Sequence, residues 1–318
     1  MAVRADDSLH SVLGKTRPLS QASLEVFVAG HADRLLPPAE YGRFEVREVD
    51  VKTALTKCAM PGDIWSLNPY MGCSHDCAYC YVPDVAHVER RKWGSYVVVK
   101  RNLPTLLAKE MARKAPKEVF LSSATDPYQP VESEHRVTRR CMELLVKHDW
   151  PVHVLSRNPL MKRDTDLFVQ LSDAEFGMSV PTLDDEARRL IEPGAPPIEG
   201  RLRTLRALAD AGLTTFANIM PAFPLTGGHG PDDVAKAFKE AGVGVVSAGA
   251  WRYLDSVVPF LRKRLAGTAY EDVVATVREP GYYHRMFRSL ERAFERHGVP
   301  FRCVYPDPAP GAHMMRWD

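Results

Sequence analysis

Three cysteines fall within eight residues of one another, in the stretch LNPYMGCSHDCAYCYVPD. Cys73, Cys77 and Cys80 offer three thiolates, which can hold a [4Fe–4S] cluster whose fourth iron keeps no protein ligand. Zinc is the competing metal, but a structural zinc site takes four ligands, for which His75 is the candidate fourth. The i, i+4, i+7 spacing also fits an apolar stripe on a helix, although Gly72 and the polar residues between the thiols argue against that alternative.

The other three cysteines, Cys58, Cys141 and Cys303, are widely separated in the sequence. They are candidates for a second iron–sulfur cluster that also lacks one protein ligand, and such a cluster could bind substrate or give up sulfide in a sulfur insertion. The alternative is that each is a small buried apolar residue. Cys141 lies among apolar residues of a predicted helix, which favours simple packing for that residue.

The totals describe a soluble globular chain. Its 318 residues are 45% hydrophobic and 26% charged, enough for one large domain or two ordinary ones. The net charge of +2 argues against a dedicated binder of the DNA backbone. The start lacks the apolar core of a secretory signal, and no run approaches the roughly 18 apolar residues of a membrane span. We expect a cytoplasmic protein, where clustered cysteines indicate metal binding or catalysis rather than disulfides.

Short β-like runs alternate with amphipathic helical stretches from about Ile64 onward, and this alternation predicts parallel strands joined by right-handed crossovers. The predicted strands are residues 118–126, 152–157, 175–180, 214–220 and 243–249, preceded by the segment that enters Cys73. The predicted helices are residues 103–115, 135–149, 164–172, 201–212 and 231–242, with a further one at 281–298. Six βα units favour an α/β fold of the partial (βα)6 barrel type over a closed eight-stranded barrel.

The predicted domains are a lead-in over residues 1–50, the barrel with the cysteine loop over 51–255, and a helical extension with a Pro-rich tail over 256–318. The lead-in holds one candidate helix, residues 20–32. Polar residues gather where the predicted strands end, in SSATD, LSRN, MSVPT, NIMP and SAGAW. In parallel α/β folds these carboxyl ends carry the chemistry.

The cysteine spacing C-x3-C-x2-C, with an aromatic before the last cysteine, resembles the signature of the radical S-adenosylmethionine (SAM) superfamily. The longer stretch NPYMGCSHDCAYCY resembles the spore photoproduct lyase-like branch, as do WGSYVVVKRN, SSATDPYQPVE, VTRRCMELL, RDTDLF and RLIEPGAPP in the same order. The resemblance runs from about Lys52 to about Gly249. It implies a six-unit partial barrel, a [4Fe–4S] cluster on the three clustered cysteines, and reductive cleavage of SAM to a 5′-deoxyadenosyl radical that abstracts hydrogen from a substrate.

The resemblance also implies roles for individual residues. Tyr79 would lie against the adenine of SAM, and Tyr81 would face the active site as a hydrogen relay. The remaining cofactor-binding candidates are Ser122, Ser123, Asp126, Arg157, Ser179 and Asn218, all at strand ends, with turn formation or helix capping as the alternative for each. Arg157 stands where this branch more often has lysine, and a guanidinium can bind a carboxylate through two hydrogen bonds. Tyr128 and Glu132, in DPYQPVE, are the further catalytic candidates.

The sequence departs from the DNA-repair lyases at one position. Those enzymes carry a hydrogen-donating cysteine just after the second strand, where this chain has Ser123. A serine O–H bond is too strong to donate its hydrogen atom to a carbon radical. The sequence therefore favours a small nucleoside, nucleotide or sugar-type substrate, in natural-product tailoring, over duplex DNA.

The sequence leaves three alternative functions open and predicts one partner protein. The enzyme alternatives are sulfur insertion, if a second cluster exists, and repair of a DNA photolesion with Tyr81 or Cys141 as hydrogen donor. The non-enzyme alternative is an iron–sulfur or zinc-binding module. The expected partner protein is an electron donor such as flavodoxin or ferredoxin.

Overall fold

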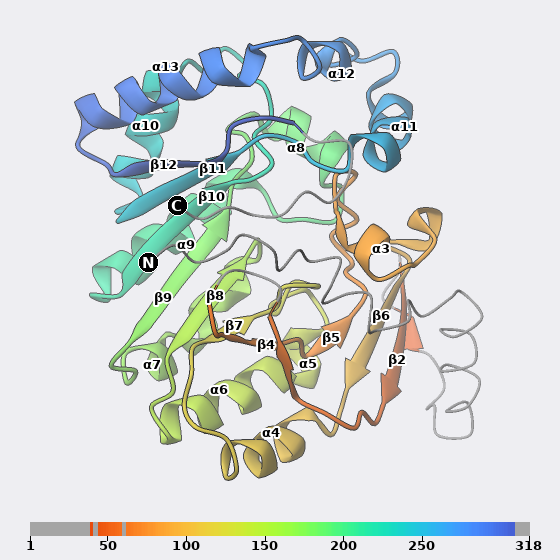
Figure 1. Cartoon of the computed structure of the whole chain (residues 1–318), viewed down its shortest axis with the longest axis vertical. Coiled ribbons are helices and arrows are strands. Elements are labelled where there is room, and N and C mark those ends of the chain that lie inside the picture. The colour runs from red at the N-terminus through yellow and green to blue at the C-terminus, as the bar shows by residue number, and fades with distance from the viewer. Residues whose placement is uncertain (1–38, 41–43, 59–61, 309–318) are drawn as a thin grey trace, which may run out of the picture.

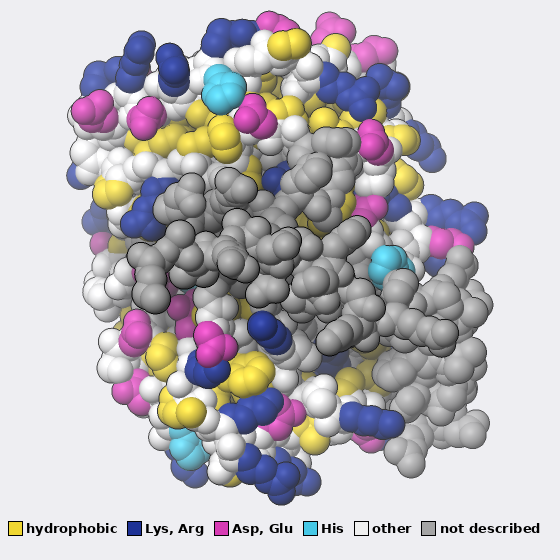
Figure 2. Space-filling view, in the orientation of Figure 1, with side chains coloured by type: hydrophobic (Ala, Val, Ile, Leu, Met, Phe, Trp, Pro, Cys, Tyr) yellow, Lys and Arg dark blue, Asp and Glu magenta, His cyan; other side chains and the backbone are white. Residues whose placement is uncertain are grey.

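The computed structural model describes residues 39–40, 44–58 and 62–308. The predicted helix at residues 20–32 and the last part of the Pro-rich tail, residues 309–318, lie outside the described residues. Figure 1 shows the described chain as one curved sheet with helices packed around it and a smaller sheet at one side. Figure 2 shows acidic and basic side chains interspersed over the described part of one face, in keeping with the net charge of +2.

The main sheet confirms the predicted partial barrel. Its strands run in the order β12-β11-β10-β9-β8-β7-β4-β3, and every neighbouring pair is parallel except β3 and β4. Within the described residues the two edge strands, β12 and β3, do not pair with each other, so the sheet stays open. The strands are β3 (Leu55–Lys57), β4 (Trp65–Leu67), β7 (Val119–Leu121), β8 (Val152–Ser156), β9 (Ala174–Ser179), β10 (Thr214–Ile219), β11 (Val245–Gly249) and β12 (Phe301–Tyr305).

Helices follow the strands as the alternation predicted. Local interactions fix where helices begin and end. Asp184 caps the first N–H groups of α8, and α13 ends at Gly298, whose backbone is in the left-handed region. Alternate strand residues such as Val152 and Val154 are buried in the core that these helices cover. The helices are α4 (Leu103–Met111), α5 (Glu132–His135), α6 (Val137–Lys147), α7 (Thr165–Phe168), α8 (Asp185–Ile191), α9 (Ile198–Asp210), α10 (Pro231–Glu240), α11 (Leu254–Leu265), α12 (Val273–Thr276) and α13 (Tyr282–His297).

A second sheet, which the sequence did not predict, supports the cysteine loop. Its strand order is β1-β2-β6-β5, and its members are β1 (Ala39–Glu40), β2 (Glu45–Val49), β5 (Tyr70–Met71) and β6 (Tyr96–Lys100). The segment predicted as one strand entering Cys73 is therefore divided: β4 belongs to the main sheet and β5 to the second. The segment that carries the three clustered cysteines follows β5 directly.

The C-terminal part of the chain contributes directly to the main sheet. The strand β12 lies beyond residue 255 and extends the parallel order next to β11, and α13 packs on α10. No described helix is both long enough and apolar enough to span a membrane.

Candidate functional site

The cysteine loop, residues 72–81, begins directly after β5 and ends at the short helix α3 (Val82–Val85). Its first residue, Gly72, has φ +76°, and a Cβ atom there would lie 2.4 Å from the carbonyl oxygen of Tyr96. Any side chain would meet both backbone strain and a steric clash, so this tight turn requires glycine.

Gln129, in the segment after β7, holds the loop from the side. Its Oε1 accepts a hydrogen bond from the Ser74 N–H at 3.0 Å, and its Nε2 donates to the Thr125 hydroxyl at 2.9 Å. Thr125 in turn donates to the Gly72 carbonyl at 2.6 Å. Protein groups alone therefore fix the course of the loop backbone.

The three loop thiols lie close enough to influence one another. Cys73 and Cys77 are buried and Cys80 is partly buried, and Cys77 interacts electrostatically with both of the others. Burial raises the pKa of all three thiols, that of Cys73 to about 12, whereas the positive charge of Arg157 acts in the opposite direction on each. In the part of the chain that the structure describes, no three Cys, His, Asp or Glu side chains stand in an arrangement that could hold a metal ion as they are. Binding a cluster requires the thiols to turn toward a common centre.

Unpaired polar atoms surround the loop. The hydroxyls of Ser74 and Ser122 and both ring nitrogens of His75 are buried without a hydrogen-bond partner. Each such atom costs about 1–3 kcal/mol if it stays unpaired, so native proteins keep few of them. Ser122 also has φ +70°, an uncommon backbone conformation for serine. Orphaned polar atoms beside three thiols fit a site that receives a polar ligand and a soft metal centre.

His75 is a neutral side chain in this setting. Burial lowers its pKa to about 4, against the opposing effect of the nearby Asp126 carboxylate. Its Nδ1 lies 3.4 Å from Oδ2 of Asp126. The ring is therefore adjacent to a carboxylate as well as to the thiols.

A buried charge network lies against the loop. Glu192 is completely buried, and its Oε1 accepts from Arg157 Nε at 2.9 Å and from the Tyr79 hydroxyl. Its Oε2 accepts from Arg201 Nη2 at 2.5 Å, and Cys77 Sγ lies 4.0 Å from Oε1. Burial opposes ionisation of Glu192, but the two guanidinium groups outweigh it and lower the pKa to about 2. Glu192 is therefore a carboxylate with two arginine partners.

Arg157 uses only part of its guanidinium in this network. Its Nε bonds Glu192 and its Nη2 lies 3.4 Å from the Tyr79 hydroxyl, while its Nη1 has no hydrogen-bond partner among the described residues. The side chain is 22% exposed. A guanidinium held on its Nε side keeps the Nη edge available for a second carboxylate.

Asp126 organises the strand ends rather than offering a free carboxylate. Its Oδ1 accepts from the Ser156 hydroxyl at 2.7 Å and from the Tyr128 N–H at 2.9 Å. Its Oδ2 accepts from the Arg157 N–H at 2.7 Å. Asp126 thereby joins the ends of β7 and β8 and positions the backbone of Arg157.

Ser123 and Tyr81 meet at the end of the loop. The Tyr81 hydroxyl donates to the Ser123 carbonyl at 2.5 Å, and the Ser123 hydroxyl lies 2.7 Å from that of Ser66. Tyr81 is 42% exposed, and its ring stacks on Tyr253 with 6.0 Å between centroids. Tyr81 is thus an exposed aromatic directly after the last cysteine of the loop.

Ser179 and Asn218 lie at the carboxyl ends of β9 and β10, as predicted, and pair in register with each other. Asn218 pairs in register with Ser247 on β11 as well. Residues in register on parallel strands project from the same face of a sheet. The three polar side chains therefore form one row on the sheet at the edge where the loop lies.

The structure does not support catalytic roles for Tyr128 and Glu132. Both are fully buried, and both oxygens of Glu132 are occupied, by the Tyr70 hydroxyl, the N–H groups that start α6, and Arg163 at 2.6 Å. Tyr128 lies beside Asp164, with Arg163 6.0 Å from its ring centre. These residues connect β5, α6 and the 3-10 helix η3 (Pro159–Asp164), and a catalytic role for either stays a prediction from the sequence.

The described structure gives no support to a second cluster on the isolated cysteines. Cys58 follows β3 and interacts electrostatically with Tyr81, and Cys303 lies in β12, at the other edge of the main sheet. Cys303 lines a surface pocket of about 150 Å³ with Phe287 of α13, and Cys141 is buried on α6 near Glu132. The second cluster, and the sulfur insertion that depends on it, stay predictions from the sequence.

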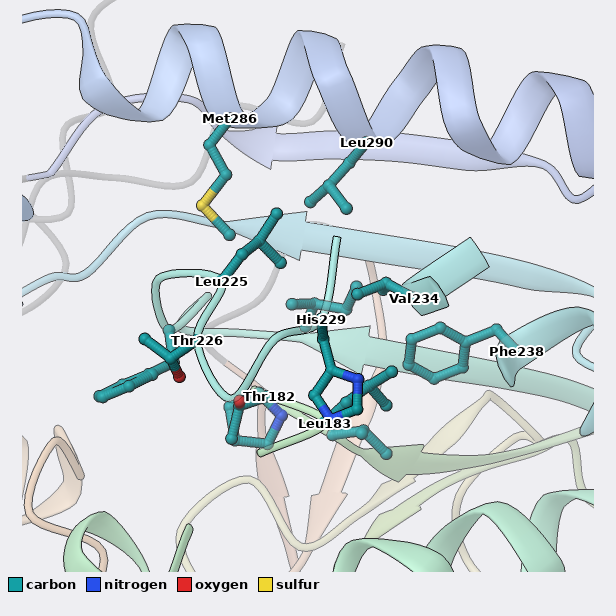
Figure 3. A pocket seen from close by; sticks show the side chains of 13 residues that line it. Thr182, Leu183, Leu225, Thr226, His229, Val234, Phe238, Met286 and Leu290 are labelled. Carbon is teal, nitrogen blue, oxygen red and sulfur yellow. The ribbon is translucent and has the colours of Figure 1, made fainter. Parts of the chain in front are cut away.

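A separate apolar pocket lies between the segments after β9 and β10 and the helices α10 and α13 (Figure 3). Leu225, His229 and Met286 are among its lining residues. Its volume of about 10 Å³ accommodates about one water molecule, too little for a substrate.

The fold and the cysteine loop define the class of protein. A family model described as the Radical SAM superfamily matches residues 67–226, which is half of the chain and includes the whole loop. The chain belongs to the radical SAM superfamily. Membership implies a [4Fe–4S] cluster and SAM as cofactors.

Two proteins from other organisms are similar to this chain in sequence. An uncharacterized protein of Methanocaldococcus jannaschii is 31% identical over 183 residues, which cover 57% of this chain and 69% of that protein. The radical SAM Nα-GlyT isomerase of Pseudomonas phage M6 is 27% identical over 174 residues, 54% of this chain and 35% of the isomerase. The chain thus spans only about a third of the isomerase.

Solved structures show the same fold at low identity. Spore photoproduct lyase in complex with a dinucleoside spore photoproduct has a TM-score of 0.62 and 14% identity, and the match covers 80% of each chain. Streptococcus suis SuiB bound to the precursor peptide SuiA has a TM-score of 0.51 and 10% identity over 80% of this chain and 50% of SuiB. At these identities the likeness concerns the fold alone.

Two residues of the site, Glu192 and Arg201, were not predicted from the sequence. Glu192 lies in RLIEPGAPP and Arg201 begins the segment RLRTLRALADAG. Tyr79 and Glu192 are 113 residues apart, and neither residue type nor spacing indicates that they are partners. The Glu-Pro-Gly step directly after the helix α8 was the available signal.

Proposed function

We propose that this protein is a radical SAM enzyme that abstracts a hydrogen atom from a nucleoside, nucleotide or sugar-type small molecule. The observation that carries the proposal is a loop of three buried or partly buried thiols, with buried unpaired polar atoms at Ser74, His75 and Ser122 and one guanidinium with an open edge. When bound and reduced, the cluster supplies the electron that cleaves SAM to methionine and a 5′-deoxyadenosyl radical.

Cys73, Cys77 and Cys80 would hold the cluster, because these three thiols of one loop interact electrostatically with one another. Arg157 would bind the carboxylate of SAM through its Nη edge. Ser122 would offer its unpaired hydroxyl to the polar end of the same cofactor. Tyr79, next to Arg157, would pack against the adenine.

Two similar proteins and one residue, Tyr81, support this substrate class. Spore photoproduct lyase was solved with a dinucleoside photoproduct, and the phage isomerase is named for a GlyT compound. Tyr81, exposed and directly after Cys80, offers an aromatic face and a hydroxyl at the site. A planar aromatic face suits a nucleobase. We propose Tyr81 as the residue that contacts substrate.

Repair of a DNA photolesion is the second candidate, favoured by the likeness to the lyase fold. It requires a hydrogen donor other than Ser123, whose hydroxyl is engaged with Ser66. Cys141 does not suit the role because it is fully buried on α6, near Glu132 and Lys100. Of the two predicted hydrogen donors, Tyr81 and Cys141, Tyr81 therefore fits better.

The test is anaerobic reconstitution with iron and sulfide, followed by assay of 5′-deoxyadenosine from SAM with dithionite or reduced flavodoxin as electron donor. We expect about four irons per chain and deoxyadenosine formation, both lost in Cys77→Ala and both kept in Cys303→Ala. Deuterium transfer from labelled nucleosides, sugars and a dinucleoside photoproduct would separate the two substrate candidates. One zinc per chain with no deoxyadenosine would contradict the proposal and favour a metal-binding module.

A further inference from the structure

The turn formed by residues 191–195 docks directly on the cysteine loop. The Ala78 N–H donates to the Ile191 carbonyl at 2.8 Å, and the Gly194 N–H donates to the His75 carbonyl at 3.1 Å. A Cβ atom on Gly194 would lie 2.0 Å from the carbonyl oxygen of Ser74, so the turn approaches as closely as a backbone can. Two chain segments more than 100 residues apart are joined here by backbone contacts on both sides of Glu192.

Glu192 adds a charged connection at the centre of this turn. Its carboxylate bonds Arg157 Nε at 2.9 Å and the Tyr79 hydroxyl on one oxygen, and Arg201 at 2.5 Å on the other. Arg201 is itself completely buried and donates to the Ser179 carbonyl at 2.8 Å and to the Pro196 carbonyl at 2.9 Å. Glu192 is therefore fixed to β9 and α9 through Arg201, and it fixes Tyr79 and Arg157 in turn.

We propose that Glu192 is a positioning residue that holds Arg157 and Tyr79 in place for SAM and sets the local charge beside the cluster. The inference rests on the proposed function, because it assigns Glu192 to the same cofactor site. Metal sites depend on such supporting groups, whose loss typically costs about 10–100-fold in affinity or activity. A carboxylate shared by two guanidinium groups orients both more narrowly than a solvated side chain could.

The negative charge of Glu192 also leads to a prediction for the midpoint potential of the cluster. The Glu192 carboxylate lies 4.0 Å from Cys77 Sγ and contributes one negative charge there. Glu192→Gln keeps the shape of the side chain and removes this negative charge, while the positive charge of Arg157 stays. Additional positive charge near a cluster favours its reduced form, so the midpoint potential of the cluster should shift upward.

The first experiment uses the protein without cofactors. Hydrogen–deuterium exchange of the peptide that covers residues 74–80 is compared between wild type, Glu192→Gln and Glu199→Gln, an exposed control on α9 that pairs only with Arg203. We expect exchange in Glu192→Gln to be faster by roughly tenfold, because the loop loses a buried charged connection, and no change in the control. Equal exchange in all three proteins would overturn the inference.

The second experiment uses the reconstituted enzyme and measures the cluster midpoint potential and the Kd for SAM. We expect Glu192→Gln to raise the potential and to weaken SAM binding by roughly tenfold. Arg201→Lys, which keeps the charge but not the fork of hydrogen bonds, should weaken SAM binding without raising the potential. Tighter SAM binding in Glu192→Gln would show that Glu192 merely competes for Arg157, which contradicts the inference.

Failure of the proposed function is distinguishable from failure of this inference. If the wild type takes up no cluster or binds no SAM, the proposed function is wrong, while the exchange experiment still tests the connection between Glu192 and the loop. If Glu192→Gln does not fold, Arg201→Lys and Tyr79→Phe carry the same comparison. Unchanged exchange and SAM affinity in both would overturn the positioning role.

Discussion

Arg157 has two edges in different environments, and this difference can be tested residue by residue. Its Nε side is held by Glu192, and its Nη1 has no hydrogen-bond partner among the described residues. Arg157→Lys keeps the positive charge but cannot bond Glu192 and a second carboxylate together. We expect the Kd for SAM to rise by roughly tenfold, about 1.4 kcal/mol, with little change in iron content. Isothermal titration of the reconstituted protein measures this, and an unchanged Kd would contradict the role given to Arg157.

Neighbouring serines give a matched pair of variants. Ser122 has a buried hydroxyl without a partner, whereas the hydroxyl of Ser123 bonds Ser66. Ser122→Ala should leave the free energy of unfolding of the cofactor-free protein unchanged or slightly higher and weaken SAM binding. Ser123→Ala should lower the free energy of unfolding by about 1 kcal/mol. Urea unfolding and SAM titration of both variants check this, and the reverse pattern would show that Ser122 does not face the cofactor.

The sequence predicted those features of the site that depend on residues close together in the chain. The three loop cysteines are readable because their spacing is local, and the strand-end serines follow from the βα alternation. Tyr128 and Glu132 lie in a buried network with Arg163, which no spacing in their motif indicates. The isolated cysteines carry no spacing at all, and only the sheet order separates them.

Among the elements, α8 leads into the turn that supports the cysteine loop, and Asp184 caps its first turn. Asp184 accepts from the Glu186 and Ala187 N–H groups at 3.0 and 3.1 Å and from the Tyr270 hydroxyl at 2.8 Å. Burial opposes its ionisation, but these hydrogen bonds lower the pKa of Asp184 overall. We expect Asp184→Ala to lower the free energy of unfolding by about 1–2 kcal/mol near pH 7.

The pH dependence of that difference has a definite sign. Because the folded-state pKa lies below the unfolded value of about 3.9, the carboxylate contributes fully above that pH and loses its contribution as pH falls through the folded pKa. Denaturant unfolding of wild type and Asp184→Ala at pH 7 and at low pH should therefore show a gap that narrows on acidification. Glu186→Ala, also in the first turn but exposed, is the control. A constant gap would contradict the assignment of the charge.

The strands and long helices of the barrel were predictable because each repeats one pattern over enough residues. The second sheet was not, because β5 has two residues and β1 has two, too few for any periodic signal. β12 was hidden in a Pro-rich stretch. The predicted helical extension with a Pro-rich tail over residues 256–318 therefore did not include a strand that pairs with β11.

At the scale of the whole molecule, the C-terminal segment belongs to the core. Phe294 of α13 is fully buried between Phe238 of α10 and Phe301 of β12, with ring centroids at 6.0 and 5.0 Å. We expect Phe294→Ala to lower the free energy of unfolding by about 3–5 kcal/mol in one cooperative transition. Thermal and urea unfolding followed by circular dichroism measure this. A separate early transition that leaves the rest folded would show that α13 and β12 form an independent unit.

The central claim is that the three thiols of the cysteine loop hold a cluster whose open iron receives SAM. The most direct measurement is electron paramagnetic resonance of the anaerobically reconstituted and reduced protein, with and without SAM. The account predicts a [4Fe–4S] signal of about one spin per chain that changes when SAM is added, and that is absent from Cys77→Ala. A cluster signal that SAM leaves unaltered would contradict it.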